Sequence, residues 1–310
     1  MPDSVNVFAP ATVANVTCGF DILGFAVDAP GDEVILKKNN SGKVVIREIS
    51  GDGGKLPHDP EKNTVGVVIS RFLDDLELDL GIDIYLTKKM PLGSGLGSSA
   101  ASSVAAIYAI NELVGRPRSV QNLLPYAMEG ERVACGAAHA DNVAPGLFGG
   151  FVLIRSYQPL ETVKIPVPDN LYATIIHPQI EVRTKDAREI LKREIRFSDS
   201  VRQSGNVAGL IAGLLMADYE LIGKSMHDYI VEPIRSILIP GYDEVKQAAL
   251  NSGALGAGIS GSGPSLFALN KGKEIAEKSA IAMQEVFLSL GIDNEVYVSK
   301  INEIGPKVLD

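Results

Sequence analysis

The stretch that decides the fold is Pro91-Leu-Gly-Ser-Gly-Leu-Gly-Ser-Ser-Ala100. It follows an alternating apolar segment at 82–87, which is typical of a strand, and it leads into an apolar-faced helix at 99–114. Alternate glycines let successive backbone N–H groups point into one anion-binding concavity, and the start of the helix adds its own unsatisfied N–H groups. We therefore predict that this loop grips the phosphates of a nucleotide.

The loop differs from two common phosphate-binding patterns. No Lys-[Ser/Thr] pair follows Gly97, so it is not a Walker A loop, and the chain lacks the H-R-D and D-F-G signatures of protein kinases. A plain Gly/Ser turn that caps a helix is the simpler interpretation. Three alternating glycines between a strand and a helix exceed what such a turn needs, which favours the phosphate interpretation.

The composition restricts the classes of protein to which the chain can belong. It has 310 residues, 45% hydrophobic and 22% charged, as expected for one large globular domain or two packed ones. The net charge of −9 disfavours general nucleic-acid binding, which needs a basic face. The start of the chain has no signal-peptide pattern, and no apolar run approaches the roughly 20 residues of a membrane-spanning helix. We expect a cytoplasmic protein that binds neither nucleic acid nor membrane.

Strand and helix patterns are mixed along the chain, which predicts an α+β fold. The predicted strands are 5–9, 34–36, 82–87, 150–154, 171–176 and 265–269, and the predicted helices are 63–76, 99–114, 119–134, 207–216, 242–253 and 275–290. Pro125 lies inside the third helix, which we expect to kink or restart there. Proline-rich interruptions near 155–170 predict a division into an N-terminal domain at 1–160 and a C-terminal domain at 161–310.

The segment after the first strand, residues 9–24, presents Asn15 and Asp21. These side chains can bind a polar substrate, but Asn and Asp are also common turn formers. A second glycine segment at 256–264 includes Gly261 and leads into a strand, and it can close against the first loop or against a substrate. Its four glycines exceed the needs of one tight turn.

Residues 129–142 carry several polar groups. Glu129 and Glu131 fall on different helix faces, so at most one faces a given site, where a carboxylate near a nucleotide is a natural Mg²⁺ ligand. His139, which we place at the end of this helix, is by itself more often structural than catalytic. Asp141 is a candidate general base for a hydroxyl nucleophile.

Taken together, these segments resemble the motifs of the GHMP kinases, and the resemblance spans nearly the whole chain. The blocks that carry it are Ala14-Asn-x-x-x-Gly-Phe-Asp-x-x-Gly24, Pro91 to Ala101, His139-Ala-Asp-Asn-Val-Ala-Pro145 and Gly258-Ile-Ser-Gly-Ser-Gly-Pro264. Lesser matches are Thr184-x-x-Ala-Arg188 and Glu232-Pro-x-Arg235. The block that begins at His139 resembles the branch of this family that phosphorylates L-homoserine.

The resemblance implies a ribosomal-protein-S5-like N-terminal domain, a ferredoxin-like C-terminal domain and an active site between them. It implies phosphoryl transfer from ATP, with Mg²⁺, to the hydroxyl of L-homoserine in threonine biosynthesis, and it suggests a homodimer. The implied nucleotide-binding residues are Pro91, Leu92, Gly93, Ser94, Gly95, Leu96, Gly97, Ser98, Ser99, Ala100 and, near the adenine, Asn63. The implied Mg²⁺ ligands are Ser99 and Glu131. The implied substrate-binding residues are Asn15, Asp21, His139, Asp141, Asn142, Thr184, Arg188, Arg235 and Gly261, with both arginines on the carboxylate and Asp21 on the ammonium.

The chemistry at the hydroxyl is less defined by the resemblance. Relatives such as mevalonate kinase place a catalytic Asp after Ser-Gly, whereas His139-Ala precedes Asp141 here. Our hypothesis is that Asn142 orients the hydroxyl and that no general base is needed, so the candidate catalytic residues are Asn142, Asp141, Ser99 and Glu131. The alternatives are a GHMP kinase for another alcohol, such as mevalonate, and a GHMP-fold protein that binds a ligand without catalysis.

Overall fold

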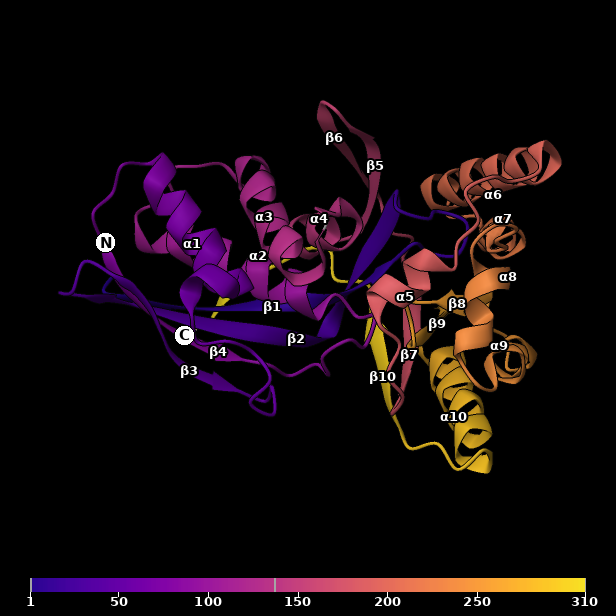
Figure 1. Ribbon diagram of the computed structural model, residues 1–310. Coiled ribbons are helices and arrows are strands. Elements are labelled where there is room, and N and C mark those ends of the chain that lie inside the picture. The colour runs from indigo at the N-terminus through magenta and orange to yellow at the C-terminus, as the bar shows by residue number, and fades with distance from the viewer. Residues whose placement is uncertain (1, 137, 310) are drawn as a thin grey trace.

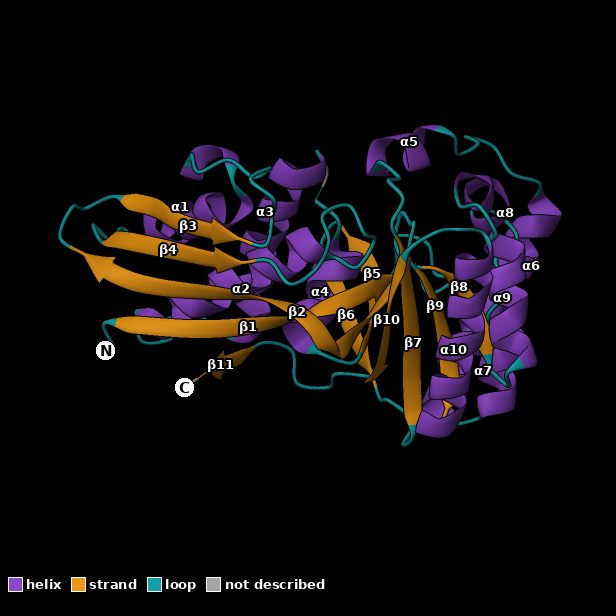
Figure 2. Cartoon of the chain, turned by 90° about the horizontal axis from the view of Figure 1, so that it is seen from below, coloured by secondary structure: helices purple, strands orange, loops and turns teal. Residues whose placement is uncertain are grey.

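The computed structural model describes residues 2–136 and 138–309, which form two β-sheets with helices packed on them (Figures 1 and 2). The expected α+β class is confirmed. The two ends of the chain lie near each other at one end of the molecule (Figure 1). Within the described ranges, no helix has the length and apolar character needed to cross a bilayer.

The first sheet has the strand order β11-β1-β2-β4-β3, with β5 paired to β2 and β6 paired to β5. Its strands are β1 (Ser4–Ala14), β2 (Leu23–Asn39), β3 (Val44–Ser50), β4 (Gly81–Thr87), β5 (Phe151–Tyr157), β6 (Leu160–Ile165) and β11 (Lys307–Leu309). The pairs are antiparallel except for β3 with β4, which is parallel. The long strands β1 and β2 form the floor on which the helices pack.

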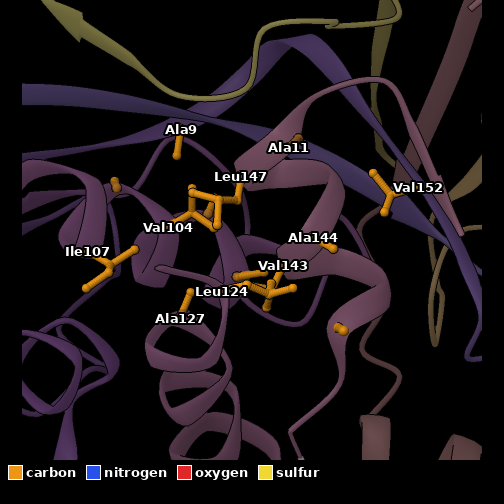
Figure 3. Close-up of a cluster of buried hydrophobic side chains, with 14 of the residues drawn as sticks. Ala9, Ala11, Val104, Ile107, Leu124, Ala127, Val143, Ala144, Leu147 and Val152 are labelled. Carbon is orange, nitrogen blue, oxygen red and sulfur yellow. The ribbon is translucent and has the colours of Figure 1, made fainter. Parts of the chain in front are cut away.

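Helices cover one face of this sheet (Figure 1). They are α1 (Thr64–Asp75), α2 (Ser98–Leu113), α3 (Leu124–Cys135) and α4 (Ala140–Phe148). The central helix α2 is buried along almost its whole length, because its many alanines let β1, β2 and the neighbouring helices approach closely. Figure 3 shows Val104 of α2, Leu124 of α3 and Leu147 of α4 in the same buried cluster as Ala9 of β1. This core fixes the start of α2, where the glycine loop ends.

The second sheet has the order β10-β7-β9-β8 and is antiparallel. Its strands are β7 (Leu171–Pro178), β8 (Gly256–Ile259), β9 (Leu266–Lys271) and β10 (Asn294–Lys300). Helices α9 (Tyr242–Asn251) and α10 (Lys273–Ser289) pack on it and bury Met283 and Phe287 against Ile176. The other helices here are α5 (Thr184–Glu189), α6 (Phe197–Met216), α7 (Tyr219–Ser225) and α8 (Glu232–Arg235).

The described elements differ from the predicted ones in informative places. The helix predicted at 119–134 restarts at Leu124, because Pro125 is accommodated only in a first turn. The helix predicted at 207–216 begins earlier, at Phe197, where exposed apolar side chains hide the amphipathic pattern. We expected His139 at the end of the preceding helix. Instead it is the N-cap of the separate helix α4. The preceding helix α3 ends at Cys135, and its C-cap Gly136 has a left-handed φ of 78°.

The division into 1–160 and 161–310 stays a prediction. Strand β6 spans this boundary and pairs with β5 of the first sheet. Strand β11, from the C-terminal end of the chain, pairs with β1. A division by sheets would therefore assign β6 and β11 to the N-terminal part.

Candidate active site

A cavity of about 450 Å³ is lined by residues from both parts of the chain. Its lining includes the predicted nucleotide residues Leu92, Gly93, Ser94, Gly95, Gly97, Ser98, Ser99 and Asn63. It also includes the predicted metal, catalytic and substrate residues Asn15, Asp21, Glu131, His139, Asp141, Asn142, Thr184, Arg188, Arg235 and Gly261. Pro91, Leu96 and Ala100 are not in this lining, and Leu96 and Ala100 belong to the hydrophobic core. The individual roles of these residues stay predictions.

The glycine loop has the backbone geometry that its sequence predicts. Gly93, Gly95 and Gly97 have left-handed φ angles of 70°, 76° and 64°. A β-carbon on Gly95 would lie 2.5 Å from the carbonyl oxygen of Ser260, so only glycine fits there. Gly97 is the N-cap of α2 and no side chain caps this helix, which leaves its first N–H groups for an anion.

The second glycine segment packs directly on the first loop. The Ser260 hydroxyl donates to the Gly95 carbonyl at 2.7 Å, and the Ser265 backbone N–H donates to the Ser94 carbonyl at 3.3 Å. The Gly261 N–H donates to the Ala14 carbonyl at 3.2 Å. The segment therefore closes against the first loop, and Gly261 and Ser262 also line the cavity, so its contact with a substrate stays a prediction.

A buried ion pair, which the sequence did not indicate, lies under the loop. Lys88 Nζ contacts Asp32 and donates to the Ser98 carbonyl at 2.8 Å and to the Ser102 hydroxyl at 2.7 Å. Burial lowers the pKa of Lys88, while Asp32 opposes this change. The Ser98 hydroxyl donates to Asp32 at 3.3 Å, so it faces the interior and leaves the backbone N–H of Ser98 for a phosphate.

Two predicted Mg²⁺ ligands line the cavity, Ser99 and Glu131, and Glu131 is buried. Glu129, on the other helix face, is partly exposed and pairs with Arg132 at 3.1 Å. Among the described residues, no cluster of three or more His, Cys, Asp or Glu side chains could hold a metal ion. Mg²⁺ usually takes one or two carboxylates together with substrate phosphates, so a single carboxylate and a hydroxyl suit it.

An apolar part of the lining contains Leu56 and Pro57. The buried side chain of Asn63 braces it, because Asn63 Nδ2 donates to the Pro57 carbonyl at 2.8 Å. Asn63 Oδ1 accepts from the Val65 N–H at 3.2 Å and caps α1. Both polar groups of Asn63 are thus engaged, and an adenine placed here would contact mainly the apolar wall.

Opposite charges meet elsewhere in the cavity. Arg188 Nη2 donates to both carboxylate oxygens of Asp21, at 2.8 and 3.0 Å. Arg235 is buried and its Nε donates to the Ala187 carbonyl at 2.9 Å. Both guanidinium groups lie over the ring of Phe20, at 5.6 Å for Arg188 and 5.0 Å for Arg235, so Phe20 is a site residue that sequence reasoning missed. Burial lowers the pKa of Arg235 to about 10, which leaves it charged at neutral pH.

Asn15 connects these charges to the second glycine segment. Its Nδ2 donates to the Gly261 carbonyl at 2.7 Å, and its Oδ1 accepts from the Asp21 N–H at 3.0 Å. The Gly261 carbonyl also accepts from Arg235 Nη1 at 3.1 Å. Asn15 therefore holds Asp21 in place, and Thr184 contacts the same segment through the Ser262 hydroxyl at 3.2 Å.

The start of α4 brings three predicted residues to the cavity. Asn142 Oδ1 accepts from the Thr12 hydroxyl at 2.8 Å, so its Nδ2 is the group left for a substrate. Asp141 is buried, and its pKa is raised to about 7, first by desolvation and then by the charge of Asp21. Burial lowers the pKa of His139, which keeps the imidazole neutral at physiological pH.

Two family models match the chain, "GHMP kinases N terminal domain" over residues 63–150 and "GHMP kinases C terminal" over residues 210–287. The chain belongs to the GHMP kinase family, and the resemblance inferred from the sequence is confirmed. Similar full-length proteins are called homoserine kinase. The one from Chlorobium phaeovibrioides is 51% identical over 99% of both chains, and the one from Xylella fastidiosa is 39% identical over 97% of this chain and 93% of that protein.

Solved structures show the same relationship. The crystal structure of homoserine kinase from Cytophaga hutchinsonii has a TM-score of 0.98 and 63% identity, and the match covers 100% of this chain and 98% of that chain. The L. major mevalonate kinase in complex with R-mevalonate has a TM-score of 0.71 at 16% identity, over 95% of both chains. This second likeness concerns the fold alone.

Proposed function

We propose that this chain is an ATP-dependent kinase that converts L-homoserine to O-phospho-L-homoserine, a step of threonine biosynthesis. The observation that carries the proposal is the set of charges in the cavity of the phosphate loop. Asp21 offers an anion, and Arg188 and Arg235 offer cations, which together complement an α-amino acid zwitterion. Mevalonate has no amine for Asp21. The names of the full-length relatives support the same substrate.

On the donor side, the proposed roles follow from the loop geometry. The phosphates of ATP bind the N–H groups of the glycine loop and of the start of α2, which stabilise anionic oxygens without rearrangement. Leu56 and Pro57 contact the adenine of ATP. Ser99 and Glu131 hold Mg²⁺, which when bound neutralises charge on the transferred phosphoryl group.

On the acceptor side, positioning is the main contribution of the protein. Because Thr12 holds Asn142 Oδ1, Asn142 Nδ2 is directed to the substrate hydroxyl and orients it. Asp141 lies buried beside it, and its pKa of about 7 keeps it the alternative candidate for a general base. A loose phosphoryl-transfer transition state needs little help from a base, so alignment of the hydroxyl supplies most of the effect.

The test is ADP release by the purified protein with ATP and Mg²⁺ and a panel of L-homoserine, L-serine, L-threonine, mevalonate and galactose. We expect robust turnover with L-homoserine only. Turnover with mevalonate or galactose instead would favour another GHMP kinase. Silence across the panel, together with measurable ATP binding, would favour a non-catalytic ligand-binding protein.

We further propose that the protein works as a homodimer in the cytoplasm, where ATP and amino-acid precursors are available. Exposed apolar side chains on α6 support an interface: Phe197, Val201, Leu215 and Met216. Size-exclusion chromatography with light scattering should give twice the chain mass of 32.9 kDa. A single chain mass would contradict the dimer, and recovery in the membrane or secreted fraction of cells would contradict the location.

A further inference from the structure

We infer that Tyr157 is a positioning residue that sets the spacing between the two ends of the substrate site and thereby the length of substrate accepted. This inference rests on the proposed function. Tyr157 ends β5 and, within the described chain, is not part of the cavity lining. Its hydroxyl donates to the Asp21 carbonyl at 3.0 Å and accepts from the Ala140 N–H at 3.3 Å. One oxygen atom thus joins the loop of Asp21 to the start of helix α4, two segments that are far apart in the sequence.

The first loop carries the proposed receptor of the substrate ammonium. Asp21 has a left-handed φ of 59°, a conformation that a residue with a side chain keeps only when its surroundings hold it. Three contacts do so: Asn15 Oδ1 accepts from its N–H, Arg188 pairs with its carboxylate, and Tyr157 donates to its carbonyl. Removal of the Tyr157 hydroxyl would leave that carbonyl without this donor.

The start of α4 carries the proposed orienting group for the substrate hydroxyl. Ala140 is the first residue of α4, so its N–H has no partner inside the helix. The N-cap residue His139 makes no side-chain hydrogen bond to the helix, and the Tyr157 hydroxyl accepts from Ala140 instead. Because Asn142 lies in the same first turn, the position of this hydroxyl sets where Asn142 stands.

The consequence is that the spacing between Asp21 and Asn142 selects the length of the substrate. Asp21 would bind the α-ammonium and Asn142 the reacting hydroxyl, and Tyr157 fixes one relative to the other. L-Serine is one methylene shorter than L-homoserine, and 5-hydroxy-L-norvaline is one methylene longer. A fixed spacing favours L-homoserine, which has the middle length. If the spacing can vary, the kcat/KM values for the three amino alcohols should become more similar.

The test compares the wild-type protein with Tyr157→Phe, which removes only the hydroxyl. The matched control is Tyr219→Phe, since the Tyr219 hydroxyl also donates to a backbone carbonyl, that of Asp169, but on α7 and away from the cavity. We expect Tyr157→Phe to lower kcat/KM for L-homoserine about tenfold or more, because small misplacements of a reacting group are costly. The preference for L-homoserine over L-serine and 5-hydroxy-L-norvaline should shrink, with the KM for ATP unchanged. Tyr219→Phe should behave as wild type.

The outcomes that overturn the inference are distinct. If Tyr157→Phe keeps the wild-type preference for L-homoserine, Tyr157 does not set the length of substrate accepted, even if the activity of the variant is lower. A loss of ATP affinity in parallel with the loss of activity, together with a lowered Tm, would show that the hydroxyl only supports the fold. A wild-type protein inactive with L-homoserine would overturn the proposed function itself and this inference with it.

Discussion

Asp141 is the residue whose protonation most clearly links the site to stability. Its pKa is raised to about 7 by burial and by the charge of Asp21, so between pH 4 and 7 the folded state binds a proton that the unfolded state has lost. The stabilisation linked to that proton is complete below the unfolded pKa and is lost as the pH rises through 7. Asp141→Asn lacks this titration. The free energy of unfolding of the variant minus that of the wild type should therefore be larger at pH 8 than at pH 4, by about 4 kcal/mol at most. Urea unfolding of both proteins at the two pH values measures this double difference.

The same variant tests the chemistry at the hydroxyl. If Asn142 orients the hydroxyl and no base is used, Asp141→Asn should retain turnover within about tenfold of wild type, since a loose transition state depends little on a base. Steady-state kinetics with L-homoserine would show this. Loss of turnover with intact substrate binding would instead identify Asp141 as the general base, and an equal stability difference at pH 4 and pH 8 would contradict its raised pKa.

At the scale of elements, the glycine loop depends on its contact with the second glycine segment. In Gly95→Ala a β-carbon would meet the carbonyl oxygens of Ser260 and Gly263 at 2.5 and 2.8 Å, so one of the two loops must move. The matched control is Gly53→Ala, because Gly53 has a similar left-handed φ of 64° but nothing within 4 Å of the added carbon. Both variants share a backbone cost of roughly 1 kcal/mol. Only Gly95→Ala should also raise the KM for ATP, about tenfold or more.

This comparison separates the backbone strain of alanine at a left-handed φ from the loss of contact between the two glycine segments. If both alanine variants lose the same small amount of stability and keep the same KM for ATP, the close packing of the two loops has no part in nucleotide binding. A rise in KM confined to Gly95→Ala supports the loop as the phosphate site. Isothermal titration with ATP and Mg²⁺ gives the affinity directly.

The elements that the sequence predicted well are those with a local signal. The glycine loop, α2 and β4 follow from periodicity and from the glycines of 93–97, because their geometry depends on neighbours in the chain. The strands β3, β6, β8, β10 and β11 were missed. Of these, β8 and β10 are defined by pairing with β9 and β7, and the four-residue β8 is half glycine. The buried pair of Lys88 and Asp32 was missed for the same reason, since its partners come together only when β2 and β4 align.

At the scale of the whole molecule, the site exists only where the two parts meet. Residues from the segments 15–21, 92–99, 139–142 and 261–262 line one cavity, and α5 adds Arg188 to it. The motif residues could be named from the sequence, but not the contacts between them. The contact of Asn15 with Gly261 and the bridge of Tyr157 between Asp21 and the start of α4 depend on long-range packing of β5 and the second sheet, which no local pattern encodes.

The contact of Arg188 with Asp21 tests whether this junction serves binding or stability. Both side chains are partly exposed, 43% for Arg188 and 29% for Asp21, so the pair should contribute no more than about 1 kcal/mol to the free energy of unfolding. A hydrogen bond to a substrate carboxylate is worth about 1.5–3 kcal/mol, so Arg188→Met should raise the KM for L-homoserine about 10- to 100-fold. The KM for ATP and the Tm should change little.

Arg183→Met is the matched control, because Arg183 also adjoins α5 but is 74% exposed and pairs only weakly with Glu181 at 3.5 Å. An equal rise in KM in both variants would show that positive charge near α5 attracts the substrate, without a direct contact of Arg188 with it. An unchanged KM in Arg188→Met would show that this arginine does not bind the substrate carboxylate.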